Sequence, residues 1–131
     1  MAARADVVVE GYVVDVTSPF ETQDETWGTM VSRDNTIEVV RSLKGDFSKG
    51  DFVIVRTDGG TIGDSSVWVE DETFFREGEH VIVMVVEISP GIYTSVCGVC
   101  GKYTLEGEVA SSDCTTTVFT LSDFEAAVAG D

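Results

Sequence analysis

The hydrophobic pattern of the chain consists mainly of short β-type runs, rich in Val, Ile, Thr and aromatic residues, between Gly, Asp and Ser turns. The run that begins at His80 is the most apolar of them, and the run 52–57 is apolar enough to be buried on both faces. A polar segment, 17–35, is expected to form a long loop or an irregular hairpin. Strands are predicted over residues 5–16, 36–44, 52–57, 67–69, 80–86, 92–96, 102–106 and 116–120.

In the first predicted strand, residues 5–16, the alternation of apolar and polar positions shifts at a glycine. Before Gly11 the apolar positions are odd-numbered, Val7 and Val9, and after it they are even-numbered, Tyr12, Val14 and Val16, so the alternation shifts by one residue. Such a shift indicates a bulge or a sharp bend, which is how a sheet curls into a barrel.

The turns and the C-terminus have recognisable signals. Asp58-Gly59-Gly60 predicts a tight turn with positive φ, and Pro90-Gly91 fits a type II turn. Ser122 with Glu125 three residues later reads as a capping box, so we expect a helix over 122–129 that stops at Gly130.

This series of strands predicts the fold class. Seven or eight short strands with little helix favour a mostly β fold, namely a closed or partly open antiparallel OB-like barrel with a short C-terminal helix. The absence of repeats, linkers and composition shifts predicts one domain over 1–131. An immunoglobulin-like sandwich is the alternative, although all three cysteines follow both tryptophans and so its Cys…Trp…Cys order is missing.

The net charge of the chain limits the classes of partner that we expect. The 131 residues include 24 acidic and 8 basic ones, a net charge of −16. That charge argues against nucleic acid and anionic membrane surfaces as partners. No apolar run approaches the roughly 20 residues of a spanning helix, so no membrane insertion is expected. A hydrophobic share of 43% excludes intrinsic disorder.

Two environments fit this composition. Only three of the basic residues are lysine, and low lysine with high acidity resembles archaeal-like proteins that work in concentrated salt. The alternative is an acidic soluble or exported domain. The first residues contain no secretory h-region, so we expect either a cytoplasmic protein of a high-salt organism or an extracellular one whose signal has been removed.

Five segments within residues 5–107 form a series of strand and turn signatures: ADVVVEGYVVDV, IEVVRSLKGDF, VIVRTDGGTIGD, FREGEHVIVMV and GIYTSVCGVCGKYTLEG. The series resembles small exported β-barrel domains of uncharacterised role in archaeal and bacterial surface proteins, and more loosely the OB-like netrin and inhibitor-type modules. The resemblance implies an OB-like fold and export to the cell surface, and it brings no catalytic residues. The N-terminal metal-chelating cysteine of the inhibitors is missing, so protease inhibition is not implied.

The cysteines are the sharpest chemical feature. A hairpin centred on Gly107 would place Cys100 opposite Cys114, and opposed residues lie within disulfide range. A hairpin centred on Pro90-Gly91 would place His80 opposite Gly101, beside the same cysteines. Three interpretations stay open: a Cys100–Cys114 disulfide, free buried thiols, or a zinc or thiol-redox site of Cys97, Cys100, Cys114 and His80.

Aromatic residues outside the central strands are the candidate binding residues. Exposed together, they would form a patch for a protein or another ligand, whereas core packing is the alternative for each. OB-type barrels bind along strands that correspond here to 36–44 and 52–57 and to the loop 17–35. With a single histidine and no catalytic motif, we expect a non-enzymatic binding module without a cofactor, and zinc as the alternative. The candidate ligand-binding residues are Phe20, Trp27, Trp68, Phe74 and Phe75.

Overall fold

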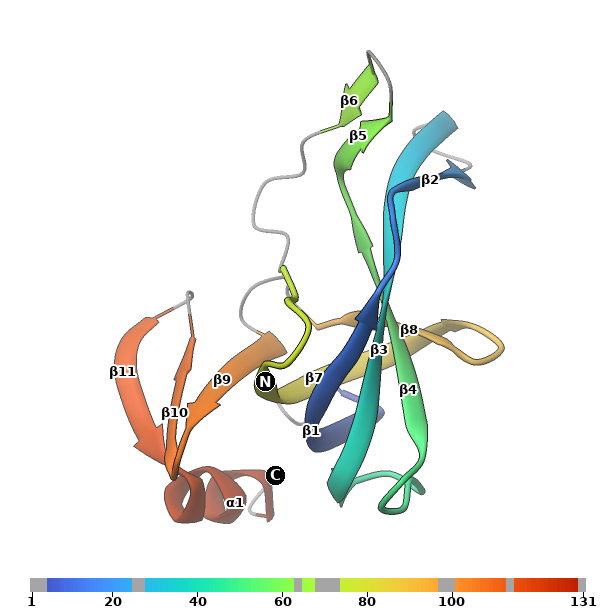
Figure 1. Cartoon of the computed structure of the whole chain (residues 1–131). Helices are drawn as coiled ribbons and strands as arrows, with labels where there is room; N and C mark the ends of the chain where they lie inside the picture. The colour runs from blue at the N-terminus through green and yellow to red at the C-terminus, as the bar shows by residue number, and fades with distance from the viewer. Residues whose placement is uncertain are drawn as a thin grey trace.

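The computed structural model describes residues 5–24, 28–62, 65–67, 74–96, 101–112 and 115–129. Within these ranges the chain is mostly β-strand and ends in a short helix (Figure 1). In chain order the elements are β1 (Val7–Val16), β2 (Phe20–Asp24), β3 (Gly28–Lys44), β4 (Phe52–Asp58), β5 (Gly60–Ile62), β6 (Ser65–Val67), β7 (His80–Ser89), β8 (Ile92–Ser95), β9 (Lys102–Glu106), β10 (Val109–Ser112), β11 (Thr115–Thr120) and α1 (Leu121–Ala129).

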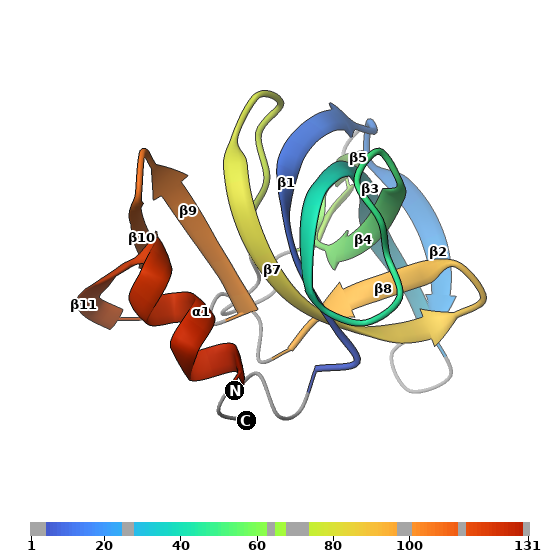
Figure 2. The same cartoon turned by 90° about the horizontal axis from the view of Figure 1, so that it is seen from below.

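Five strands close into a barrel. The pairings run β1–β3–β4–β8–β7, and β7 pairs again with β1, so the ring has no free edge. Figure 2 shows these strands around a common interior. Among the described pairings β4–β8 is parallel and the others are antiparallel, which corrects the expectation of a wholly antiparallel barrel. A closed ring of five strands followed by a short helix agrees with the predicted mostly β fold.

The interior of the barrel is filled mainly by valine. Inward positions alternate along β1, β3, β4 and β7, as the two-residue period of a strand requires. Each fully buried valine contributes about 1.5–3 kcal/mol relative to an exposed one. The buried members of this cluster, called the barrel core below, are Val7, Val9, Val13, Ile37, Val39, Val53, Val55, Phe75, Val81, Val83 and Val85.

The first strand pairs irregularly with β3 near Gly11, but the extra residue lies on the partner strand. Glu10 pairs with Arg41 and Gly11 with Val39, so Val40 of β3 is the bulged residue, and the pairing of β1 with β7 continues through Gly11 without a shift. Val13 nevertheless remains in the barrel core, while Tyr12 and Val14 are both 45% exposed. The predicted change of face after Gly11 is therefore wrong. The change comes three residues later, because the register also shifts between Val13 and Asp15.

The strand β7 is apolar along most of its length because both of its faces are covered. Its odd-numbered valines fill the barrel core, and its even-numbered residues Ile82 and Met84 belong to a second cluster outside the barrel. In that second cluster the outer sides of β1 and β7 pack against β9, β10 and α1. The other members of this cluster, called the outer core below, are Ala5, Val8, Val96, Leu105 and Ala110, with Leu43, Val86, Tyr103 and Leu121 packed against them.

One strand prediction is settled and another needs correction. Of the two forms expected for 17–35 the hairpin is the one observed, since β2 pairs with the first part of β3, which runs 17 residues. The run 52–57 is buried on one face only, because its outward side chains alternate with Val53, Val55 and Thr57. The outward face of β4 holds Arg56, which forms a two-bond ion pair with Asp34 of β3 at 2.8 and 3.0 Å.

The predicted turns and the presence of a C-terminal helix agree with the structure, but the predicted helix cap does not. Gly59 and Gly91 have φ values of +107° and +78°, as the turn signals predicted. The helix α1 starts one residue earlier than expected, and the hydroxyl of Thr120 accepts a hydrogen bond from the Asp123 amide at 3.1 Å. The cap is therefore Thr120, and the predicted capping box from Ser122 to Glu125 is wrong. The predicted stop at Gly130 lies outside the described residues.

Candidate ligand pocket at the barrel end

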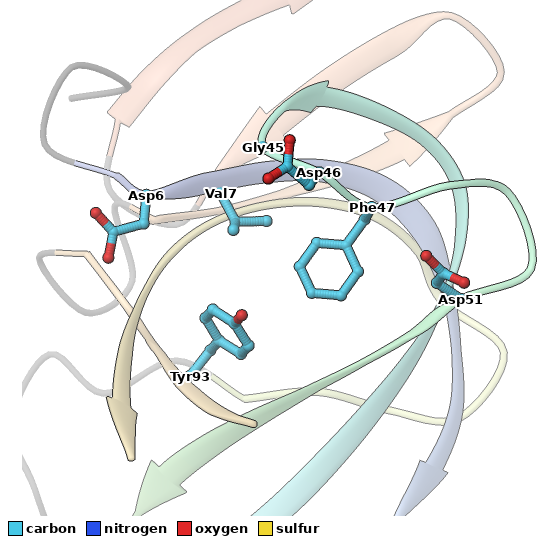
Figure 3. A pocket seen from close by; sticks show the side chains of 7 residues that line it. All are labelled: Asp6, Val7, Gly45, Asp46, Phe47, Asp51 and Tyr93. Atoms are coloured by element: carbon cyan, nitrogen blue, oxygen red, sulfur yellow. The ribbon is translucent and has the colours of Figure 1, made fainter. Parts of the chain in front are cut away.

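A pocket of about 320 Å³ opens at one end of the barrel (Figure 3). Three separate segments line it: the start of β1, the connection between β3 and β4, and β8. The lining residues are Asp6, Val7, Gly45, Asp46, Phe47, Asp51 and Tyr93.

The β3–β4 connection is held in shape by its own hydrogen bonds. The Asp51 carboxylate accepts a hydrogen bond from the Ser48 amide at 2.8 Å, and the Asp51 amide donates to the Ser48 carbonyl at 3.0 Å. Val39 of β3 anchors the turn, since its carbonyl accepts from the Gly50 amide and its amide donates to the Asp51 carbonyl, both at 2.8 Å. Gly45 has a φ of +102°, which allows the chain to leave β3 toward the pocket. The connection therefore presents Asp46 and Phe47 from a hydrogen-bonded frame.

Two aromatic rings lie between the pocket and the barrel core. Phe47 and Tyr93 meet edge to face, with ring centroids 5.9 Å apart and planes at 71°, and both pack against the core valines. Burial raises the pKa of the Tyr93 phenol, and the negative charges of Glu87 and Asp6 and a hydrogen bond with Glu87 raise it further. The phenol is therefore neutral at pH 7, and its raised pKa reflects an anionic environment.

Carboxylates surround these rings. Figure 3 shows Asp6 on one side of the pocket and Asp51 on the other, with Phe47 and Tyr93 between them and Asp46 beside Gly45 at the top of the view. All three aspartates are exposed, and none of the described lining residues is basic. An aromatic surface beside carboxylates is suited to an organic cation, because the ring faces and the carboxylates both attract positive charge.

Of the predicted aromatic patch, one described member is buried. Phe75 is 7% exposed and belongs to the barrel core, so it cannot contribute to a surface. Phe20 is half-buried in β2 with Arg56 5.2 Å from its ring centroid, whereas Phe74 is 68% exposed before β7. Trp27 and Trp68 lie outside the described residues.

The predicted cysteine cluster rested on two strand registers, and both differ from the structure. Glu106 pairs with Val109, so the β9–β10 hairpin is displaced by one residue from the register that set Cys100 opposite Cys114. Val81 pairs with Thr104, so His80 does not lie opposite Gly101. Cys97, Cys100 and Cys114 themselves lie outside the described residues, and the disulfide, free-thiol and zinc interpretations stay predictions.

His80 belongs to a different network. Its Nε2 lies 2.7 Å from a carboxylate oxygen of Glu10, and its ring stacks on Tyr12 with centroids 4.4 Å apart. The same carboxylate, 8% exposed, accepts a hydrogen bond from Arg41 at 3.0 Å, and Arg41 also pairs with Glu125 of α1. The hydrogen bond with Glu125 raises the pKa of Arg41 despite the opposing effect of burial. These contacts give His80 a structural role on the outer barrel face and connect α1 to β1 and β3.

Metal-binding geometry is missing from the part of the chain that the structure describes. Within residues 5–24, 28–62, 65–67, 74–96, 101–112 and 115–129, no three His, Cys, Asp or Glu side chains are grouped to hold a metal ion. The three aspartates of the pocket are thus arranged around the rings and not around a common point.

Sequence reasoning missed most of the pocket. Phe47 follows a Gly-Asp pair that marks a strand end, and this is the signal that should have suggested an aromatic side chain folded back on a barrel end. Asp6 and Tyr93 give no such signal, since they meet Phe47 only because β8 lies beside β4 and β1 closes the ring.

Among the described residues, no helix has the length and apolar character needed to cross a bilayer. Comparison of the chain with protein-family models, curated proteins and solved structures gives no significant match.

Proposed function

We propose that this protein is a non-enzymatic binding module whose barrel-end pocket takes an organic cation, such as the ammonium or guanidinium group of a small ligand or of a protein side chain. The observation that supports this function best is the composition of the pocket. Three carboxylates and two aromatic rings share one cavity in which the described lining residues include no base.

The size of the pocket fits such a group. Its volume of about 320 Å³ is at the small end of ligand sites, and suits one basic side chain or a small amine more than a large cofactor. The apolar surface of Phe47, Tyr93 and Val7 would contact the methylene groups, and the aspartates would pair with the charged end.

The charge of the whole molecule favours the same ligand. A net charge of −16 attracts cations from a distance and repels anions, so encounter with a cationic partner is accelerated at low salt. The ligand is expected to bind more weakly as salt rises, because the carboxylates are exposed and therefore screened.

The test is an NMR titration of the protein with n-butylammonium, and with butyrate as an anionic probe of similar size. We expect n-butylammonium to shift the resonances of Val7, Phe47 and Tyr93 and butyrate to leave them unchanged. A bound cation stabilises the phenolate, so it should also lower the pKa of Tyr93, measured from the ring carbon shift.

Paired variants separate a defined site from general attraction to an acidic protein. The double variant Asp6→Asn/Asp46→Asn removes two pocket charges, and we expect it to weaken n-butylammonium binding about tenfold. A double variant of similar charge change outside the pocket, Asp15→Asn/Asp123→Asn, should bind like the parent. Equal loss in both double variants, or shifts spread over the whole surface, would mean that the pocket is not the site.

A further inference from the structure

Apolar side chains lie on the outer wall of the barrel at β4, β8 and β7. Phe52 of β4 is 60% exposed and Ile88 of β7 is 51% exposed, while Ile54 of β4 and Ile92 of β8 are half-buried. These four residues are called the apolar strip below. Large apolar side chains that are exposed together indicate a surface that another molecule covers.

Two strands of the ring place three members of the strip side by side. The valines on either side of Ile54 belong to the barrel core, so the alternation of β4 turns Ile54 and Phe52 outward. In β8, Tyr93 packs against the same core, so Ile92 also faces outward. Ile54 and Ile92 are partners in the parallel β4–β8 ladder and are therefore adjacent.

The fourth member, Ile88, is brought to the strip by a bulge. The β7–β8 register shifts between Glu87 and Ser89, and Ile88 is the extra residue there. Ser89 pairs with Ile92, so Ile88 lies beside Ile92. The strip therefore crosses three neighbouring strands of the ring.

The strip adjoins the barrel-end pocket. Asp51 lines the pocket and directly precedes Phe52, and Tyr93 lines the pocket and directly follows Ile92. Consecutive Cα atoms are about 3.8 Å apart, so on both strands the pocket and the strip are one residue apart. Figure 3 shows Asp51 at one side of the pocket and the Tyr93 ring directed into it. A ligand that fills the pocket and extends over this side of the barrel end meets the strip.

We propose that the pocket and the strip together bind a basic segment of another protein. A Lys or Arg side chain of that segment enters the pocket, and apolar side chains next to it cover the strip. This inference rests on the proposed function, because the pocket supplies the site for the cation. A small amine would occupy the pocket alone and leave the strip exposed, whereas a peptide segment carries the charge and the apolar groups on one chain.

The charges favour this partner over the other molecules that bind apolar surfaces. Asp6, Asp46 and Asp51 border the pocket, and the chain has a net charge of −16. A second copy of the chain or an anionic membrane surface is repelled by that charge, whereas a basic segment is attracted. Protein interfaces commonly combine apolar contacts at their centre with charged groups near their rim, and the strip beside the aspartates has this composition.

The test is a set of NMR titrations of the parent protein with three blocked pentapeptides. The first has a central lysine between two phenylalanines, the second replaces both phenylalanines by serine, and the third replaces the lysine by norleucine. We expect the first peptide to bind about tenfold more tightly than either of the others, because only it engages both the pocket and the strip. It should shift the resonances of Phe52 and Ile88 together with those of Val7, Phe47 and Tyr93.

Two variants remove the strip without changing a residue that lines the pocket. Phe52→Ser and Ile88→Ser should each weaken binding of the first peptide about fivefold or more and leave n-butylammonium binding unchanged. Val109→Ser is the matched control for Ile88→Ser, since Val109 is 45% exposed and lies on β10 outside the ring. It should bind the first peptide like the parent.

The outcomes separate this inference from the proposed function. Equal affinity for the phenylalanine and serine peptides, or parent-like binding by both strip variants, would overturn the inference while n-butylammonium binding still supports the pocket. A norleucine peptide that binds as tightly as the lysine peptide would also overturn it, because the strip would then take apolar chains without a cation. Failure of the parent to bind n-butylammonium would instead contradict the proposed function itself.

Discussion

At the scale of single residues, the closure of the barrel depends on how closely two backbones can approach. A Cβ atom built on Gly11 would lie 2.3 Å from the Glu38 carbonyl oxygen and 2.7 Å from Cγ2 of Ile37. Both distances are shorter than real contacts allow, and one neighbour is backbone, which cannot move without shifting β3. The glycine is therefore needed for the tight approach of β1 to β3, independently of its φ angle.

The substitution Gly11→Ala should consequently be costly. We expect it to lower the free energy of unfolding by about 2 kcal/mol, the usual scale for forcing an added methyl group into a packed site. Urea unfolding monitored by circular dichroism measures this change. Val14→Ala on the same strand is the comparison, because Val14 is 45% exposed and its truncation should cost well under half as much. Similar losses in both variants would show that the β1–β3 contact is more adaptable than the distances indicate.

Residue patterns indicated an irregularity near Gly11, but neither the strand that carries the bulge nor the faces of the residues that follow. Alternation alone counts residues, and it cannot tell that Val14 is the extra residue of a second bulge. A shift of one residue reverses every side chain after it, so Tyr12 and Val13 exchanged their predicted environments. Tyr12 and Val13 can each lie inside the barrel or on its outer surface. The sequence therefore does not show whether the alternation shifts directly after Gly11 or later.

At the scale of elements, hydrophobic periodicity found most of the described strands but not β2, β5 or β10, and local signals set strand ends and registers poorly. The helix shows why. Ser122 and Glu125 have the spacing of a capping box, yet Glu125 pairs with Arg41 of β3 and the backbone amide of Asp123 is satisfied by Thr120. The Glu125 side chain, which the capping box would require, forms an ion pair with a residue distant in the sequence. The same limit applies to β9, whose register with β7 differs from the one that a simple hairpin count gives.

The observed cap at Thr120 and the capping box expected at Ser122 predict different effects of substituting these two residues. Thr120→Ala removes the observed cap and should destabilise α1 by about 1 kcal/mol, whereas Ser122→Ala should change stability by less than about 0.5 kcal/mol. Hydrogen exchange of the α1 amides and thermal unfolding would measure both effects. If Ser122→Ala proved the more damaging change, the helix would begin later in solution than it does in the structure.

At the scale of the whole molecule, the order in which strands meet decides the candidate site. The sequence predicts a barrel because it predicts many short strands and turns, but the parallel pairing of β4 with β8 is a property of the closed ring. That pairing sets Tyr93 opposite Val55 and so beside the connection that holds Phe47. The pocket is formed by three segments that are far apart in the chain. It can therefore be predicted only from the order in which the strands pair, and not from any single motif.

The acidic surface is also a property of the whole molecule, and it leads to a prediction about salt. Described ion pairs such as Arg56–Asp34 and Lys102–Glu79 offset part of the negative charge, but with 8 bases for 24 acidic residues a large excess remains. Self-repulsion at a net charge of −16 opposes the compact state, and it weakens as salt screens it.

We therefore expect the melting temperature to rise with KCl. If the charge is an adaptation to concentrated salt, the rise should continue well above 1 M, where the screening length of about 3 Å already removes most repulsion between surface charges. Calorimetry over a KCl series measures this, and a parallel sucrose series separates an ion effect from general exclusion of cosolutes from the surface. A plateau below 1 M would instead identify the acidic residues as a means of keeping an exported or soluble domain in solution.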